Sequence, residues 1–194
     1  MIVCARAAAL TLATTAIILS LAAPLTPALG AQDSPTTVVL VRHGEKATTP
    51  ANDPGLTDAG VARAQALVKV LAGAKIGAVI ATQFTRTRDT AQPTAEAAHL
   101  AIETIATGPK DVHAKAVADA VRRHMGQTVL VVGHSNTLTS IIAALGGPTL
   151  RDLCDSEYSD LFTLVLDKGS ARLVRASYGA PSPEQPTGCP TAPR

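Results

Sequence analysis

Two short apolar runs place the strongest constraint on the fold of this chain. Residues 37–41 (TVVLV) and 128–132 (TVLVV) consist almost wholly of aliphatic and β-branched side chains. They lack the polar alternation of a strand that has one face in water. Such runs are typical of central strands that are covered on both faces. The sequence therefore predicts a sheet buried between two layers of helices.

Helical and strand-like segments alternate through most of the chain. The clearest predicted helix covers residues 56–73, with Thr57 at its N-cap and Gly73 at its end. A turn that contains Arg86 and Arg88 precedes another helix. This alternation predicts an α/β fold, a three-layer α/β/α sandwich with a mainly parallel central sheet. The other predicted elements are strands at 76–81, 101–104, 161–166 and 171–177 and helices at 89–99, 111–125 and 134–147.

The first thirty residues differ in character from the rest. Residues 1–30 hold a single charge, Arg6, followed by an apolar run that ends in small residues. This pattern predicts a secretory signal peptide cut after Gly30, with an uncleaved membrane anchor as the alternative. We expect residues 31–180 to form one domain and 181–194 to be a Pro-rich C-terminal tail. The protein would then be secreted, or lie in the periplasm or cell envelope.

The cysteine count agrees with export. Without the leader the chain keeps Cys154 and Cys189, an even number in an oxidising compartment. The two residues either form one disulfide that ties the tail to the domain or remain two thiols. Sequence alone does not test the geometry that a bridge requires.

Composition excludes some classes of function. Hydrophobic residues make up 46% of the chain but aromatic residues only 2%, so the core must be built from aliphatic side chains. The formal net charge of +2 argues against a general nucleic-acid binder, which needs a clustered basic face. The sequence has neither a Walker A lysine motif nor the three spaced glycines of a dinucleotide site.

Charged and titratable residues follow the predicted strands. Arg42 and His43 end the first apolar run, His134 ends the other, and Arg86 lies just after the strand at 76–81. In parallel sheets, ligands bind beyond the carboxyl ends of the strands. If these turns converge, guanidiniums and imidazoles surround a pocket that suits a tetrahedral dianion. The alternative for the first motif is an ordinary arginine–carboxylate pair beside a surface histidine.

The same residues carry a family resemblance. Arg-His-Gly-Glu at 42–45, Leu-Thr-Asp-Ala-Gly at 56–60, Thr-Arg-Thr-Arg-Asp-Thr-Ala at 85–91 and Gly-His-Ser at 133–135 resemble the histidine phosphatase superfamily, branch 1, also called phosphoglycerate mutase-like. The resemblance covers about residues 36–178 and marks residues 31–180 as a histidine phosphatase catalytic domain.

The resemblance implies roles for individual residues. His43 looks like the nucleophile that accepts the phosphoryl group. Arg42 and Arg86 would bind the phosphate oxygens, and His134 would complete the pocket. Arg86 is favoured over Arg88 because Thr90-Ala91 follows it at the family's spacing. An imidazole needs no strong base to act as a nucleophile, and arginines can stabilise the transferred charge without a metal.

The general acid is an open question at this stage. Asp111, at the start of a predicted helix, is the tentative candidate, and an ordinary helix-start acid is its alternative role. Glu45 and Glu157 are the other candidates. Ser135 occupies the place of the aspartate that some relatives carry after the second histidine, so that solution is absent. His99, His113 and His124 lack motif context, and we expect them on helix surfaces with no role in a metal site.

The short segment between Arg86 and His134 predicts an open pocket, which favours hydrolysis over transfer back to a substrate. We therefore expect a metal-independent phosphatase that hydrolyses phosphomonoesters, a phosphoric monoester hydrolase with no cofactor. The alternatives are a protein (phosphohistidine) phosphatase and a non-catalytic phosphate-binding module. The expected partner is a phosphorylated small molecule or protein, not a nucleic acid, and a membrane only if the leader is uncleaved. Sequence predicts no oligomeric state.

Overall fold

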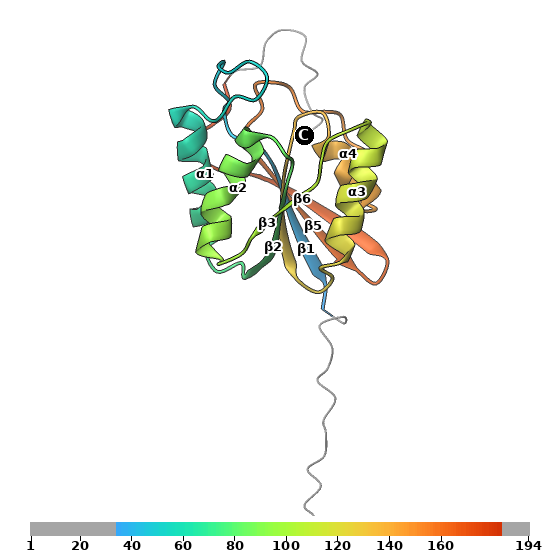
Figure 1. The fold of residues 1–194 in the computed structure, drawn as a ribbon. Helices are drawn as coiled ribbons and strands as arrows, with labels where there is room; N and C mark the ends of the chain where they lie inside the picture. Colours follow the sequence, from blue (N-terminus) through green and yellow to red (C-terminus); the bar gives the residue numbers. More distant parts are fainter. Residues whose placement is uncertain (1–33, 184–194) are drawn as a thin grey trace, which may run out of the picture.

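The computed structural model describes residues 34–183, which form one mixed sheet flanked by helices (Figure 1). The strand order is β3-β2-β4-β1-β5-β6. The first four of these pair in parallel, and β5 and β6 pair antiparallel at one edge. The strands are β1 (Thr36–Arg42), β2 (Ile76–Ala81), β3 (Ile102–Thr104), β4 (Thr128–Gly133), β5 (Asp160–Asp167) and β6 (Ser170–Ser177).

Helices cover both faces of the sheet, which confirms the predicted α/β/α sandwich. Helices α1 and α2 pack together on one face, and α3 and α4 pack together on the other (Figure 1). The helices are α1 (Asp58–Val70), α2 (Thr85–Ala97), α3 (Lys110–Arg122) and α4 (Leu138–Ala144).

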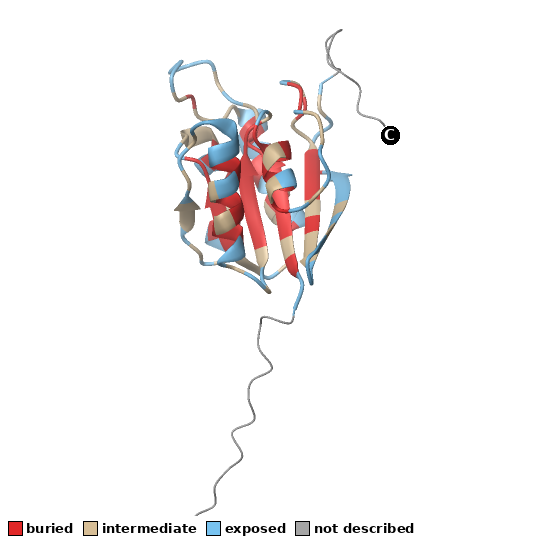
Figure 2. Cartoon of the chain, turned by 90° about the vertical axis from the view of Figure 1, so that its right-hand side faces the viewer, coloured by how far each residue is buried: buried red, intermediate tan, exposed pale blue. Residues whose placement is uncertain are grey.

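The central strands supply side chains to both helix layers. In β1, Val38 and Leu40 join the core beneath α3 and α4, whereas Val39 and Val41 join the core beneath α1 and α2. The residues of β4 alternate in the same way. Figure 2 shows the buried centre of the sheet against the exposed outer faces of the helices. Uninterrupted apolar runs are therefore required here, because neither face of β1 or β4 meets water.

Helix α1 begins after Thr57, as the sequence predicts, but it ends at Val70, three residues before the predicted end at Gly73. The Thr57 side chain accepts a hydrogen bond from the backbone N–H of Gly60, as an N-cap residue does. Gly73 adopts a left-handed conformation with φ of 84° just beyond the helix.

Helix α2 begins at Thr85, four residues earlier than predicted, so the prediction of a turn at Arg86 and Arg88 was wrong. The cause is a distant cap: Asp53, in the loop before α1, accepts hydrogen bonds from the backbone N–H and the hydroxyl of Thr85. Local sequence offered no capping side chain to detect, because Phe84 occupies the N-cap position. Both arginines therefore lie in the first turn of the helix.

Helix α4 is shorter than the predicted 134–147 segment. Residues 134–137 precede it, and Gly146, with φ of 91°, follows its end. Thr137 occupies the N-cap position without a side-chain cap; its hydroxyl instead accepts a hydrogen bond from the His134 backbone N–H. These four residues consequently form a turn at the end of β4.

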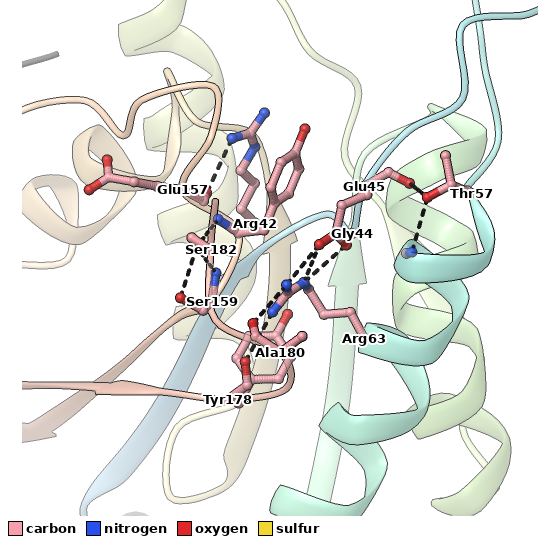
Figure 3. Close-up of polar contacts among 12 residues, drawn as sticks. Arg42, Gly44, Glu45, Thr57, Arg63, Glu157, Ser159, Tyr178, Ala180 and Ser182 are labelled. Carbon is pink, nitrogen blue, oxygen red and sulfur yellow. Dashed lines mark hydrogen bonds and ion pairs between the residues drawn. The ribbon is translucent and has the colours of Figure 1, made fainter. Parts of the chain in front are cut away.

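Several predictions fall outside the described residues. The proposed leader at 1–30, most of the tail at 181–194 and Cys189 are among them. The pairing of Cys154 with Cys189 and the exact domain bounds stay predictions. The start of the tail is held in place, because Ser182 accepts hydrogen bonds from the backbone N–H groups of Tyr158 and Ser159 (Figure 3). Between residues 34 and 183, no helix is long and apolar enough to cross a membrane.

Candidate active site

A pocket of about 370 Å³ opens beyond the carboxyl ends of β1 and β4. The parallel register explains why two distant motifs meet there. Arg42 pairs with Gly133, so the next residue of each strand, His43 and His134, leaves the sheet at the same level. The pocket is lined by Arg42, His43, Lys46, Phe84, Arg86, Thr107, Gly108, His134, Ser135, Asn136, Thr137 and Asp155. It therefore brings together the four residues expected to bind phosphate.

His43 is a buried residue of the pocket lining, and a hydrogen bond indicates which of its ring nitrogens carries the proton. Its ring Nδ1 lies 2.7 Å from the carbonyl oxygen of Gly44. A carbonyl only accepts, so we assign the proton to Nδ1, which leaves the Nε2 lone pair available as a nucleophile. Burial lowers the pKa of His43 to about 3, against the opposing effect of the Gly44 carbonyl, and the nearby Arg42 charge lowers it further. The imidazole is consequently neutral at physiological pH.

His134 faces His43, with their ring centroids 5.3 Å apart. Its Nε2 lies 3.0 Å from the hydroxyl of Thr82, which in turn contacts the hydroxyl of Thr87. This chain of contacts fixes the orientation of the ring. Burial, followed by the charge of Arg86, lowers the pKa of His134 to about 4.

Arg42 is buried and held mainly by backbone oxygens. Its Nη1 donates to the carbonyls of Cys154, Asp155 and Glu157 at 2.9–3.1 Å. Figure 3 shows the bond to Glu157. Its guanidinium also lies 4.0 Å from the centre of the Tyr158 ring. The loop after α4 therefore fixes this cation at the pocket wall.

Arg86 reaches the pocket from the first turn of α2. Its guanidinium lies 4.3 Å from the centre of the Phe84 ring, and its Nη1 lies 3.8 Å from a carboxylate oxygen of Asp53. Arg88, in the same turn, is exposed and contacts the Thr85 hydroxyl instead. The structure thus places Arg86, and not Arg88, in the pocket.

Gly44 packs directly against the first turn of helix α1. A Cβ atom there would lie 2.8 Å from the carbonyl oxygen of Gly60, so this glycine is needed for the close approach of α1. The Gly44 backbone N–H donates to the hydroxyl of Thr90 in α2. The sequence analysis did not predict these contacts of Gly44 with Gly60 and Thr90, although all three residues lie in the motifs.

The three carboxylates predicted as general acids lie away from the pocket. Asp111 is exposed and is not part of the lining. Glu45 accepts hydrogen bonds from Arg63. Glu157 accepts from Arg151. Burial favours the protonated form of each glutamate, but the arginine hydrogen bonds outweigh it, so the pKa of both is lowered.

Two residues occupy positions that the sequence did not indicate. Asp155 lines the pocket, although its loop has no motif. His113 was expected on a helix surface and is instead only 2% exposed, with its Nδ1 donating to the carbonyl of Ala106. That bond anchors the segment leading to Thr107 and Gly108 in the pocket wall. His99 is exposed, and His124 is half-buried beside Glu103.

Comparison with known proteins supports the interpretation of this pocket. A family model described as the histidine phosphatase superfamily (branch 1) matches residues 38–107, which include His43 and Arg86. No curated protein matches the sequence.

Solved structures share the fold at low sequence identity. YhfR of Bacillus stearothermophilus is 22% identical with a TM-score of 0.57, over 71% of this chain and 95% of that one. The protein histidine phosphatase SixA, solved with tungstate, is 22% identical with a TM-score of 0.58, over 73% and 96%. A phosphoglycerate mutase from Bacillus anthracis is 17% identical with a TM-score of 0.57, over 75% and 94%. At these identities the likeness establishes the phosphoglycerate mutase-like fold alone.

Proposed function

We propose that the chain is a member of the histidine phosphatase superfamily (branch 1), whose family model matches residues 38–107, and that it is a metal-independent phosphatase. It hydrolyses phosphomonoesters through a phosphohistidine intermediate on His43. The observation that carries this proposal is the neutral His43 ring on the floor of a pocket that also holds Arg42, Arg86 and His134. The guanidiniums supply the positive charge that a transferred phosphoryl group needs.

The reaction takes two displacements at phosphorus. The Nε2 lone pair of His43 attacks the phosphorus atom, a P–N bond forms, and the bond to the ester oxygen breaks. Arg42 and Arg86 stabilise the charge on the phosphoryl oxygens, and the leaving oxygen takes up a proton. A water molecule then attacks phosphorus, the P–N bond breaks, and inorganic phosphate and neutral His43 are formed.

Water reaches the intermediate because the pocket has little cover. Between Arg86 and His134 the chain forms the rest of α2, the three-residue strand β3 and helix α3, joined by short loops. Between Arg86 and His134, only Thr107 and Gly108 line the pocket. An accessible phosphohistidine favours hydrolysis over return of the phosphoryl group to an acceptor.

A second candidate is a phosphatase that acts on phosphorylated proteins, including phosphohistidine. The open pocket favours it, since no lid in residues 34–183 would exclude a folded substrate. One structural neighbour, SixA, is a protein histidine phosphatase by its description. A binding module that holds phosphate without turnover is the remaining alternative.

We also propose that the protein is exported. This proposal rests on the sequence of residues 1–30 and on the even number of cysteines that remain after it. Mass spectrometry of the processed protein should find Ala31 as its first residue and a bridge between Cys154 and Cys189. A chain that keeps Met1, or two alkylatable thiols, would contradict the proposal.

The test of the function is phosphate release by the purified protein in the presence of EDTA. Wild-type protein should hydrolyse p-nitrophenyl phosphate. After the phosphoenzyme is trapped, an acid-labile phosphate indicates a histidine linkage, and an acid-stable phosphate indicates an ester. His43→Ala should abolish release and trapping. His99→Asn, at an exposed position with φ of 56° that asparagine tolerates, is the matched control and should leave both unchanged.

The candidates separate on a substrate panel. Faster release from phosphohistidine-containing protein than from any small phosphomonoester would favour the second candidate. If calorimetry detects phosphate binding but no substrate is turned over, both enzyme proposals are wrong and the binding module remains.

A further inference from the structure

The proposed reaction needs a proton donor for the leaving oxygen, and Asp155 is the one carboxylate that lines the pocket among residues 34–183. Glu45 and Glu157 are each held by an arginine, and Asp111 lies outside the lining. The two histidines of the pocket are neutral, and His43 is occupied by the attack on phosphorus. A donor must therefore come from the mouth of the pocket.

Asp155 combines a fixed backbone with a loose carboxylate. Its carbonyl oxygen accepts from Arg42 Nη1 at 2.9 Å, which fixes the residue against the pocket wall. Its side chain is 97% exposed and makes only long contacts, 3.5 Å from Oδ1 to Arg42 Nη2 and 3.4 Å from Oδ1 to the Ser135 hydroxyl. A carboxylate held this weakly can exchange partners when a substrate arrives.

A bound phosphate would compete with Asp155 for the same nitrogen, Nη2 of Arg42. Arg42 Nη1 is already used by three carbonyls, and Nε is buried away from solvent. An incoming anion must therefore bind Arg42 through Nη2, the atom that Asp155 contacts in the free protein. A phosphoryl oxygen at Nη2 would leave Asp155 beside a dianion, and adjacent like charges favour the protonated carboxylic acid.

The geometry of displacement then aims that proton at the leaving group. His43 is 4% exposed and lies on the floor of the pocket, so its attack comes from below. The entering and leaving atoms of a phosphoryl transfer lie roughly in line, so the ester oxygen departs toward the mouth. Asp155 is the acidic side chain on that side.

We propose that Asp155 is the general acid that protonates the leaving oxygen when phosphoryl transfer to His43 breaks the ester bond. In the second displacement the resulting carboxylate accepts a proton from the attacking water. Once phosphate leaves, Asp155 releases that proton to solvent and regains its contact with Arg42, which restores the free protein. This inference rests on the proposed phosphatase function.

The test compares substrates that differ in their need for a proton. Asp155→Asn should reduce kcat/KM for an alkyl phosphate by about 10²–10³-fold. The same variant should lose less than about tenfold on 2,4-dinitrophenyl phosphate, because that leaving group departs as an anion. The dependence of kcat/KM on the leaving-group pKa should become steeper. Asp111→Asn, which removes an exposed acid outside the pocket, is the matched control and should change neither rate.

Three outcomes would overturn the inference. An equal loss on both substrates would show that Asp155 only orients Arg42, no loss on either would exclude it as donor, and a selective loss in Asp111→Asn would move the role there. Trapping of phosphohistidine on the wild type with 2,4-dinitrophenyl phosphate keeps this test separate from the proposed function. If no phosphoenzyme forms, the phosphatase proposal fails and the acid fails with it.

Discussion

Two buried arginines, Arg42 and Arg63, look alike until their partners are compared (Figure 3). Both side chains are almost inaccessible, at 3% and 2% exposure. Both donate to backbone carbonyls: Arg42 to three in the loop after α4, and Arg63 to those of Tyr178 and Ala180 after β6. Each also lies near a tyrosine ring, that of Tyr158 or Tyr178.

The difference lies in the carboxylate. Glu45 binds Arg63 through both oxygens at 2.7–3.1 Å, whereas Arg42 has only the exposed Asp155 at 3.5 Å. A buried charge is costly unless it is paired, so Arg63 is compensated within the fold and Arg42 is not. The unmet charge of Arg42 is then available to an external anion. The two arginines therefore differ in whether a carboxylate already neutralises the guanidinium, and not in how deeply the guanidinium is buried.

The largest expected effect is a loss of activity in Arg42→Lys. An ammonium group cannot keep three carbonyls and also present a fixed donor to phosphate, so kcat/KM should fall by about 10²–10³-fold. Arg63→Lys should instead lower the urea midpoint while the folded fraction keeps its activity. Steady-state kinetics and urea unfolding on both variants measure the contrast. Similar activity losses in the two variants would erase the distinction between the arginines.

A somewhat smaller effect is expected on stability when each carboxylate is neutralised. Glu45→Gln leaves the buried Arg63 charge without its counter-ion and should cost about 3 kcal/mol of unfolding free energy. Asp155→Asn should leave the unfolding free energy unchanged, since its ion pair with Arg42 is long and exposed. Denaturant unfolding provides the measurement. The double variant Glu45→Gln/Arg63→Met should recover part of the loss, and no recovery would argue against an unpaired charge as the cause.

These two networks also mark how far sequence reasoning reaches. Arg42, His43 and His134 could be predicted because each directly follows an apolar strand, and parallel pairing brings such ends together. Glu45 and Arg63 could not be assigned to each other, because helix α1 brings them together only after Gly44 and Gly60 allow its close approach. Local patterns determine strand ends but not the partners of the side chains that follow them.

Residues that depend on long-range contacts were missed for the same reason. Asp53 caps a helix that begins 32 residues later, and the carbonyl of Asp155 binds an arginine 113 residues earlier. His113 reads as an ordinary helix residue until the carbonyl of Ala106 is seen beside it. Neither residue type nor spacing carries such information, since irregular loops provide the partner in each case.

The pH dependence of the unfolding free energy should further distinguish the surroundings of Arg42 from those of Arg63. His43 and His134 have pKa values lowered to about 3 and about 4, so the unfolded chain binds more protons as the pH falls below about 6.5. Stability should decline over that range in the wild type and in Glu45→Gln alike. Glu45 has a lowered pKa, despite burial, because of Arg63, so its contribution is present above about 4.5 and lost as the pH falls below that value.

Urea unfolding from pH 7 to pH 3 tests both parts of this expectation. The wild type should lose more stability below about pH 4.5 than Glu45→Gln, which lacks the contribution of Glu45. Burial lowers the pKa of His43 to about 3, so NMR should find its ring neutral at pH 5. A His43 ring that is charged at pH 5 would contradict the nucleophile's assigned state.

The smallest expected effect concerns the tyrosine beside Arg63. The Tyr178 hydroxyl is buried, has no hydrogen-bond partner among the described residues, and burial raises its pKa. Tyr178→Phe keeps the ring and removes this unsatisfied oxygen, so unfolding free energy should stay the same or rise by up to about 1 kcal/mol. Tyr158→Phe should likewise keep the ring that faces Arg42, with kcat/KM within about threefold of wild type. A larger loss of kcat/KM in Tyr158→Phe would mean that the Tyr158 hydroxyl, and not only its ring, supports Arg42. The sites of Arg42 and Arg63 would then differ in their tyrosines as well as in their carboxylates.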